Sequence, residues 1–381
     1  MSGNFLEIYM HAAGKSDIPP QYHRWVALTI IAAAVADRVW MRKSINMPKI
    51  IPNMYTILVG PTGVSKGLAI DFGLEMITDR ILVHYGSATY KSLIDYMVNS
   101  GSQFLLVMPE LASDLGGRRM ADMMIKHLTE WYTAFGRTMT EGTRLHGIKT
   151  YEGPTINAIL ASTPEWLVES ISREAVASGF FGRSVVISAP YDLKSKIYQP
   201  TVPTDYDECL KELQGRLLQM TYLEGEFKMT HQAKDLDEFW FNTRREPLLG
   251  MEPFYQREPI LALKLAMIMS LTDSFDLVVD AQHIEAAQKL LRELKQYMPQ
   301  IMEDCLADDV TRCKNSMSRT IHPYDCRQLR YIVRLMHIKG FNMYIIRQAL
   351  LEGKMEQMFE VIKHGDEDFL YLIPPRLRTL E

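Results

Sequence analysis

The chain has 381 residues, of which 47% are apolar and 23% charged, and its 42 basic and 46 acidic side chains leave a formal net charge of -4. This composition is typical of a globular protein with a large buried core, and it excludes disordered, collagen-like and uniformly basic DNA-packaging proteins. Any contact with nucleic acid is therefore expected to be local.

The cysteines and the apolar segments predict the compartment. The four cysteines show no Cys-x-x-Cys spacing, which favours reduced thiols over a disulfide framework or over a zinc site built from Cys305, Cys313, His322 and Cys326. Asn4–Gly14 lacks the basic and long apolar parts of a secretion signal. The longest apolar run, Trp25–Ala36, is shorter than the ~20 residues that span a bilayer. We therefore expect a cytoplasmic protein without a membrane partner.

The first half of the chain predicts an α/β core. Helices are expected at Phe5–Ala13 and Gln21–Arg38, followed by a short strand at Val39–Arg42. Strands then alternate with helices and a hairpin: strands Tyr55–Val59, Ile81–His84, Phe104–Met108, Thr155–Ala161 and Arg183–Ser188; helices Gly67–Ile77, Tyr90–Val98, Asp122–Phe135 and Glu165–Ser172; hairpin Arg137–Tyr151. Strands separated by helices predict a mostly parallel sheet with helices on both faces.

The rest of the chain reads as mainly helical. After a linker at Tyr191–Pro203, the pattern predicts helices at Asp205–Met220, His231–Arg245, Pro259–Thr272 and Ala281–Met302. Near the C-terminus it predicts three short helices, a turn and a strand: Cys326–Ile338, Tyr344–Leu351, Met355–His364, Gly365–Asp368 and Phe369–Ile373. Three helices followed by a β element form the outline of a winged helix, although a small helical cap has the same outline.

Charge is distributed unevenly along the chain. Residues 310–348 carry eight basic side chains against one acidic side chain, whereas residues 222–309 carry 17 acidic against nine basic. A local surplus of cations is typical of a face that binds phosphate. We expect Arg327, Arg330 and Arg334 to contact duplex DNA, with an ordinary solvated helix face as the alternative.

The segment Ile57–Leu68 predicts a loop that binds the phosphates of ATP. An apolar strand enters a glycine-containing turn, and a lysine stands where a helix begins. Backbone N–H groups of such a turn point toward the phosphates, and the lysine places a cation against their oxygens. The expected nucleotide contacts are Gly60, Pro61, Thr62, Gly63, Val64, Ser65, Lys66, Gly67 and Leu68. A strand-to-helix turn that binds nothing is the alternative.

Two positions depart from the usual G-x-x-x-x-G-K-[ST] pattern of such a loop. Ser65 replaces a glycine, which is tolerable if Ser65 adopts the local dihedral angles. Gly67 replaces the hydroxyl residue that normally binds Mg²⁺, a place that Thr62, Ser65 or water could fill.

A second buried strand, Phe104–Met108, is followed by Pro109 and Glu110. In the usual arrangement the first of these two positions holds Mg²⁺ and the second polarises the attacking water. Because proline cannot bind a metal, we expect Glu110 to act as the base and Mg²⁺ to be held mainly by phosphates, water and Glu110. An ATPase with weakened hydrolysis is the alternative.

Three further features have candidate roles. Thr163, with Ser162 in reserve, ends a strand where a hydroxyl could orient the γ-phosphate, although it could equally cap the next helix. Arg183 follows a glycine turn and suits a finger inserted into a neighbouring subunit's nucleotide, with an internal salt bridge as the alternative. Arg144 and Lys149 lie on the predicted hairpin, which either touches single-stranded DNA in a ring channel or is simply solvated.

Taken together, these motifs resemble those of the P-loop ATPase, helicase-like proteins that accompany or fuse to primases in bacteriophages and integrated mobile elements. The resemblance covers about Phe5–Met302 and rests on Ile51–Lys66, Met108–Leu111, Ser162–Leu167, Gly179–Arg183 and the shorter matches Pro20–Trp25, Val39–Trp40 and Arg257–Ala266. It implies a DNA-replication ATPase of the AAA+ or RecA-like type in a bacterial host cell, acting as a hexameric ring on single-stranded DNA with other replication proteins. It also implies the phosphate role for Lys66, the base role for Glu110 and the finger role for Arg183.

The sequence thus predicts an N-terminal helical region (1–45), a P-loop ATPase core (46–200), a helical domain (201–310) and a basic winged-helix-like domain (311–381). We expect an ATP- and Mg²⁺-dependent DNA translocase or helicase. A helicase loader or initiator that binds ATP and hydrolyses it weakly is the first alternative, and a DNA-binding regulator with a vestigial nucleotide fold is the second.

Overall fold

The computed structural model describes residues 3–115, 118–143, 147–171, 179–188, 201–244, 247, 251–298, 301, 307–321, 326–338, 341–365 and 367–373. The chain divides into two compact units: Met1–Trp166 with Ser170–Met302, and Leu167–Glu169 with Glu303–Glu381. None of the helices in the described residues is both long enough and apolar enough to cross a membrane.

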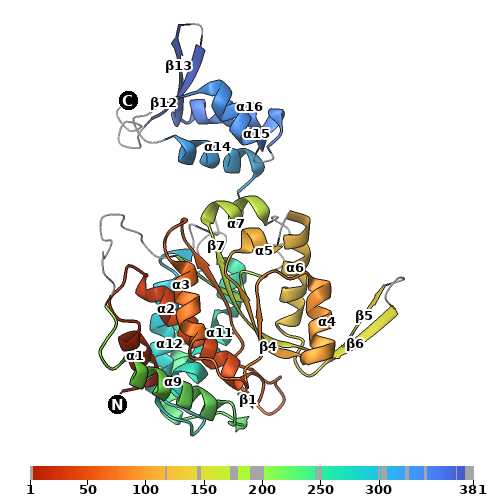
Figure 1. Cartoon of the computed structure of the whole chain (residues 1–381), viewed down its shortest axis with the longest axis vertical. Coiled ribbons are helices and arrows are strands. Elements are labelled where there is room, and N and C mark those ends of the chain that lie inside the picture. Colours follow the sequence, from red (N-terminus) through yellow and green to blue (C-terminus); the bar gives the residue numbers. More distant parts are fainter. Residues whose placement is uncertain are drawn as a thin grey trace. The chain divides into compact units, whose positions relative to one another are not determined.

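A five-stranded parallel sheet forms the centre of the first unit (Figure 1). Its spatial order is β3 (Val83–Tyr85), β4 (Gln103–Met108), β7 (Thr155–Ser162), β2 (Tyr55–Val59) and β8 (Ser184–Ser188). β2 and β7 are buried along their whole length, as expected for inner strands of a sheet that is covered on both faces. The predicted α/β core with a parallel sheet is confirmed.

Helices cover this sheet, with one group on each side of the strands in Figure 1. The first group is α1 (Phe5–Ala12), α2 (Pro20–Val35) and α3 (Lys66–Leu74), and the second includes α4 (Tyr90–Ser100) and α6 (Arg118–Trp131). α2 is buried over most of its circumference because its sequence is apolar all round. The short α5 (Leu111–Leu115) was not predicted, and α7 (Pro164–Ser170) follows β7.

His23 of α2 lies in an aromatic cluster, where its ring meets those of Tyr9 and Phe72 edge-on. Neither of its ring nitrogens has a hydrogen-bond partner among the described residues. Burial lowers the pKa of His23 from its ordinary 6.5 to about 4. The folded chain therefore holds this imidazole neutral at pH values where the unfolded chain protonates it.

This shift predicts a pH-dependent stability. Between pH 6.5 and 4 the unfolded state binds more protons, so the free energy of unfolding should fall by about 2 kcal/mol from pH 7 to pH 5. His23→Phe keeps a ring in the cluster and removes the titration, so the variant should lose that part of the fall. Urea unfolding of both proteins at the two pH values measures the difference. Equal losses of stability in the two proteins would contradict the prediction.

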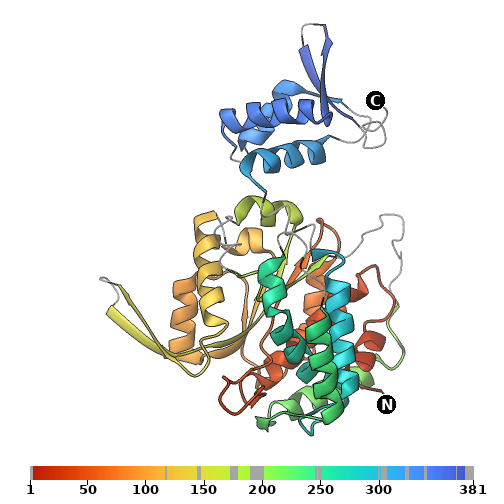
Figure 2. The same ribbon diagram turned by 180° about the vertical axis from the view of Figure 1, so that it is seen from behind.

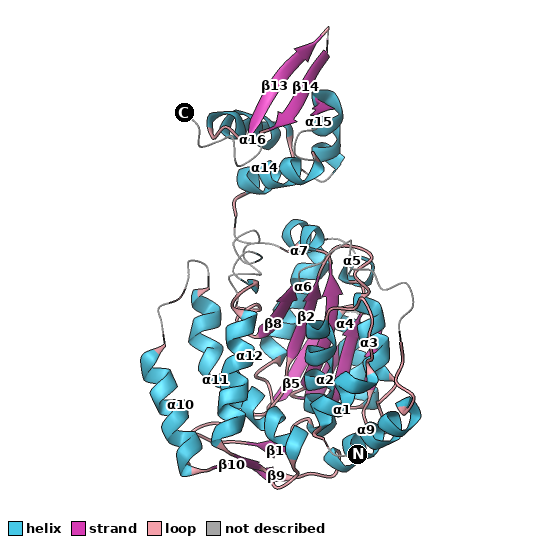
Figure 3. Cartoon of the chain, turned by 90° about the vertical axis from the view of Figure 1, so that its left-hand side faces the viewer, coloured by secondary structure: helices cyan, strands magenta, loops and turns pink. Residues whose placement is uncertain are grey.

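The described residues between 205 and 298 are mainly helical, as predicted, and belong to the first unit. These helices are α9 (Tyr206–Met220), α10 (His231–Thr243), α11 (Glu252–Asp273) and α12 (Ala281–Leu294). α11 begins before the predicted Pro259, which lies inside the helix. Four short strands, visible in part in Figure 3, form the parallel pairs β1 (Val39–Trp40) with β9 (Gly225–Glu226), and β10 (Lys228–Met229) with β11 (Val278–Val279). A strand at β1 was predicted, whereas β9, β10 and β11 were not.

The second unit packs three helices against a three-stranded antiparallel sheet in the order β12-β14-β13. Its elements are α14 (Asp309–Thr320), β12 (Cys326–Gln328), α15 (Leu329–Ile338), α16 (Met343–Met355), β13 (Phe359–His364) and β14 (Glu367–Leu372). Its core gathers buried apolar side chains from the helices and strands, including Met317, Ile332, Ile346 and Leu370.

The sequence prediction was partly wrong in this unit. The expected helix Met355–His364 is a strand from Phe359 onward, and the helix α14 was not predicted. The reason is tertiary: β13 pairs along its full length with β14. In addition, the Phe359 ring packs so closely on Gly353 that a Cβ there would lie 2.2 Å from it. Neither contact is visible in a local apolar pattern.

Candidate functional site

A cleft of about 430 Å³ lies at the carboxyl edge of the sheet. It is lined by the loop between β2 and α3, by residues that follow β4, and by Ala161–Thr163 at the end of β7. Because parallel strands end at one edge, residues far apart in the sequence meet there. Lys66, Glu110 and Thr163 therefore line one cleft, together with Thr62, Gly63, Ser65, Gly67 and Leu68.

The loop conformation explains its glycine positions. The Tyr22 hydroxyl donates a hydrogen bond to the Val59 carbonyl at 2.7 Å, and a Cβ on Gly60 would lie 2.5 Å from that hydroxyl. Gly63 has a φ of 90°, which favours glycine. Ser65 adopts the left-handed conformation at φ 52° and ψ 32°, at a cost of roughly 1–2 kcal/mol. Ser65, which stands where the usual pattern has glycine, thus adopts a backbone conformation that favours glycine.

Lys66 begins α3, and its ammonium group turns back onto the loop. Its Nζ donates to the carbonyl oxygens of Gly60 at 2.6 Å and Pro61 at 3.0 Å. Burial lowers the pKa of Lys66, and the carboxylates of Glu110 and Glu165 oppose that shift. Among the predicted nucleotide contacts, Gly60 and Pro61 thus hold the lysine, while the Val64 side chain is buried.

Glu110 is exposed and lines the same cleft, just after β4. Its backbone N–H donates to Asp114 Oδ2 at 3.1 Å, which fixes the start of α5. The Ser87 hydroxyl donates to the other oxygen of Asp114 at 3.1 Å. These contacts orient the backbone at Glu110, and its carboxylate lies near enough to Lys66 to oppose in part the lowering of the Lys66 pKa by burial.

The sequence analysis missed Asp71, which also lines the cleft. It lies one helical turn beyond Gly67 on α3, and it bonds with the Tyr85 hydroxyl, whose pKa burial and this carboxylate raise. The signal that could have revealed it is the i, i+4 spacing from Gly67, because residues four apart share a helix face. Asp71 brings a carboxylate to the side of the cleft where the usual hydroxyl ligand is missing.

Thr163 caps α7, which is the alternative role that its sequence position allows. Its Oγ1 accepts a hydrogen bond from the Trp166 N–H at 3.3 Å, and the Ser162 hydroxyl donates to the Thr163 carbonyl at 3.0 Å. Both residues nonetheless line the cleft. The capping contact fixes the Thr163 hydroxyl at the cleft wall, so the capping and orienting roles are compatible.

Arg183 lies at the other end of the sheet. It precedes Ser184, which pairs with Tyr55 at the start of β2, whereas the cleft is at the end of β2. Its guanidinium donates to the Gly179 carbonyl at 2.9 Å, and among the described residues it forms no ion pair. Burial lowers the pKa of Arg183, as does the neighbouring Arg257. Within its own chain, Arg183 does not join the other candidate residues.

The hairpin of β5 (Thr138–Thr143) and β6 (Gly147–Glu152) was predicted, and both Figures 1 and 2 show it extending away from the sheet. Lys149 forms an ion pair with Asp95 of α4, so its cation is already neutralised in part. Arg144 lies outside the described residues. The DNA role of the hairpin stays a prediction.

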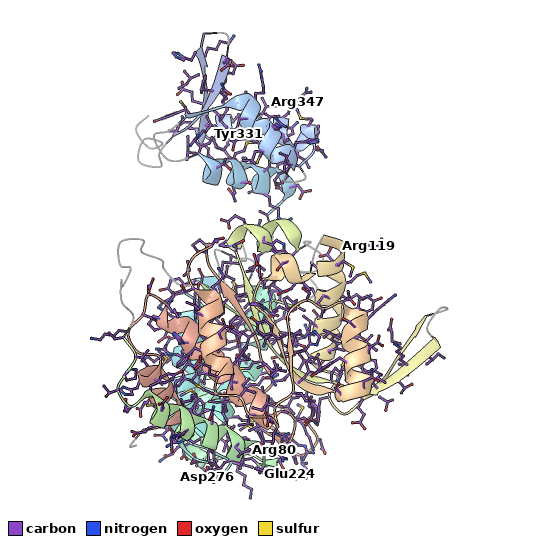
Figure 4. The ribbon with its side chains drawn as sticks, viewed as in Figure 1. Arg80, Arg119, Glu224, Asp276, Tyr331 and Arg347 are labelled. Carbon is purple, nitrogen blue, oxygen red and sulfur yellow. The ribbon has the colours of Figure 1, made fainter. Side chains whose placement is uncertain are left out.

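In the second unit, Arg327, Arg330 and Arg334 are all exposed. Two other cations counted in the basic segment are not on the surface: Arg312 is buried, and Lys314 pairs with Glu352 at 3.1 Å and Glu356 at 2.7 Å. Exposed Tyr331 of α15 and Arg347 of α16 also lie on this unit (Figure 4). The basic surface is therefore smaller than the charge count indicated.

Comparison of the sequence with protein-family models and with curated proteins finds no match.

Proposed function

We propose that the chain binds and hydrolyses ATP and uses the energy to move along DNA, as a translocase or helicase in the replication of a bacteriophage or mobile element. The observation that carries this proposal is the meeting of Lys66 and Glu110 in one cleft, at the carboxyl end of a buried parallel sheet. A cation at a helix N-terminus and an acid in the same cleft match the two charges that phosphoryl transfer needs.

The residues of the cleft would divide the chemistry between them. Lys66 would leave the carbonyl oxygens of Gly60 and Pro61 for the phosphate oxygens, which hold more negative charge. Glu110 would accept a proton from water as the water oxygen attacks the γ-phosphorus and the bond to the β-phosphate oxygen breaks. The first N–H groups of α3 would stabilise the negative charge that develops on the β-phosphate as ADP leaves.

Neither Gly67 nor Pro109 offers a side-chain ligand for magnesium. Oxygen donors are nevertheless present in the cleft on Thr62, Ser65, Asp71 and Glu110, and Mg²⁺ in such sites takes few protein ligands and keeps several waters. These residues fit a magnesium ion held chiefly by the phosphates. Magnesium would neutralise the charge that develops on the phosphate oxygens.

A second cavity, of about 280 Å³, lies at the same edge of the sheet. It is formed by the start of α2, the end of β8 and the end of α12, and Ser188 in its wall pairs with Val59, which precedes the phosphate loop. Tyr297 provides an aromatic ring, and Gln21 and Gln296 provide amide groups. Such a lining suits a planar base with polar edges, so we assign this cavity to the nucleoside.

The proposal includes an assembly of several copies, in which Arg183 would act as the finger. It lies away from the cleft of its own chain, so a finger role requires the cleft of a neighbouring subunit, as in a ring or hexamer. The exposed arginines of the second unit and the Tyr331 ring suit contact with a DNA backbone and bases.

The alternative favoured by a specific observation is a loader or initiator that binds ATP and turns it over slowly. Gly67 and Pro109 both lack the usual magnesium ligands, and a weakly held metal lowers the rate more than the affinity. This alternative predicts ATP-dependent assembly with little phosphate release.

Glu110→Gln tests the proposed role of the base. The amide cannot accept the proton, so DNA-stimulated phosphate release should fall about 100-fold or more while ATP binding persists. Phosphate release and nucleotide binding, both measured with and without single-stranded DNA, separate the two effects.

Glu165→Gln is the matched control. Like Glu110, the Glu165 carboxylate opposes the lowering of the Lys66 pKa, but Glu165 does not line the cleft. This variant should therefore keep most of the activity. A wild-type rate in Glu110→Gln would remove the assigned base. Tight binding without measurable hydrolysis in the wild type would favour the loader.

A further inference from the structure

A second cluster of ligand-type side chains lies outside the cleft, where α1 meets α9. His11 comes from the last turn of α1, and Asp205 and Cys209 come from the start of α9. The two helices lie side by side in Figures 1 and 3. One imidazole nitrogen, one carboxylate oxygen and one thiol sulfur all lie within 4.8 Å of one another.

Ordinary helix capping does not account for the contact between these groups. Asp205 is the N-cap residue of α9, yet its side chain makes no capping hydrogen bond. Its Oδ1 instead lies 3.0 Å from the Nε2 atom of His11. Cys209 stands four residues further on, one turn along the same face of α9, and is fully buried beneath the pair.

We propose that His11, Asp205 and Cys209 bind a transition-metal cation of the zinc class. Bond lengths of about 2.0–2.3 Å place the ligand atoms of a tetrahedral zinc site roughly 3.3–3.6 Å apart. The His11 and Asp205 side chains are exposed by 55% and 36%, so they can rotate to close the remaining ångström. The exposed side provides an entry path and room for water as a fourth ligand.

The types of ligand atom determine which metal ions the site would bind. A thiolate and an imidazole favour Zn²⁺, Co²⁺ or Cu²⁺ over Mg²⁺ and Ca²⁺, which prefer oxygen ligands. Binding would release the proton of the Cys209 thiol, and His11 would coordinate through the Nε2 that now faces Asp205. The site is therefore distinct from any magnesium bound with ATP.

Such a metal would join the N-terminal helices to the segment that follows the sheet. A neighbouring pair of backbone hydrogen bonds already joins them, between Lys15 and Thr201 at 3.1 and 3.0 Å. A cation coordinated by both α1 and α9 would add a second link that depends on metal supply and is lost when the thiol is oxidised.

The test uses the untagged full-length chain, stripped with a chelator and titrated with Co²⁺. We expect about one tightly bound Co²⁺ per chain. The complex should show sulfur-to-cobalt charge-transfer absorption and the visible bands of a four-coordinate ion, and added Zn²⁺ should displace the Co²⁺. Cys209→Ser should abolish the charge-transfer band. His11→Ala, a change at an exposed side chain, should weaken Co²⁺ binding at least about tenfold.

Two control variants make the result specific. Cys326→Ser removes an exposed thiol of the second unit and should leave the band unchanged, and Lys66→Ala should do the same because the cluster uses no cleft residue. A charge-transfer band that survives in Cys209→Ser, or an unchanged affinity in His11→Ala, would overturn the proposal. Failure of ATP hydrolysis would not affect it.

Discussion

Replacing Lys66 by alanine is expected to weaken ATP binding about 100-fold and to abolish DNA-stimulated phosphate release. Lys66 is the first residue of α3 and lines the cleft together with Glu110, and its ammonium group is held on the loop by the Gly60 and Pro61 carbonyls. Removing a charged hydrogen-bond donor to phosphate costs roughly 2–4 kcal/mol. Titration with a fluorescent ATP analogue and a phosphate-release assay measure the two effects.

The control for this experiment is Lys91→Ala, which removes an exposed lysine of α4 in the same unit. Its ATP affinity should equal that of the wild type. Thermal unfolding of both variants checks that they are folded, because Lys66→Ala also loses the hydrogen bonds from Lys66 Nζ to the Gly60 and Pro61 carbonyls. An Lys66→Ala protein that is folded and still binds ATP at full strength would remove the nucleotide assignment.

Gly67→Ser should increase Mg²⁺-dependent hydrolysis, with at least a roughly tenfold lower Mg²⁺ requirement. The substitution restores a hydroxyl where the usual loop has one, and the space for it exists: no atom lies within 4 Å of a Cβ built at this position. The residue also lies in the first turn of a helix, where serine is no worse than glycine. Phosphate release as a function of Mg²⁺ concentration tests the prediction.

Gly67→Ala separates the hydroxyl from the helix effect, since alanine gains the same helix propensity without a ligand. It should therefore resemble the wild type in its Mg²⁺ requirement. If alanine and serine shift that requirement equally, the added oxygen does not bind the metal. If neither variant shifts it, magnesium is already fully coordinated by other groups, for which Asp71 in the same cleft is the first candidate.

The apolar strands and their order along the chain were readable from the sequence. Tyr55–Val59 and Phe104–Met108 are local runs whose ends are marked by glycine or proline, and parallel strands necessarily end at one edge. That rule was enough to predict that Lys66, Glu110 and Thr163 would lie together. The same local reasoning could not find Asp71, because its place in the cleft depends on how α3 packs and on the contact with Tyr85.

Charge was the least reliable guide, because the sequence does not show which cations already have partners. Lys314 looks like part of a basic surface but is buried against two carboxylates of α16. Lys149 looks like a DNA contact but pairs with Asp95, which lies 54 residues away. A charged side chain can bind a ligand only when the fold leaves it exposed to solvent, because a buried charge needs an oppositely charged partner within the protein.

By itself the sequence determined the strand-loop-helix around Lys66, the buried strand before Glu110 and the alternation that makes an α/β sheet, because each depends on neighbours within a few residues. The tertiary structure alone decided that Phe359–His364 is a strand, that Arg183 lies at the edge of the sheet opposite the cleft, and that His11 meets Asp205 across 194 residues. These outcomes depend on pairing and packing between distant segments, whose free energies exceed local preferences.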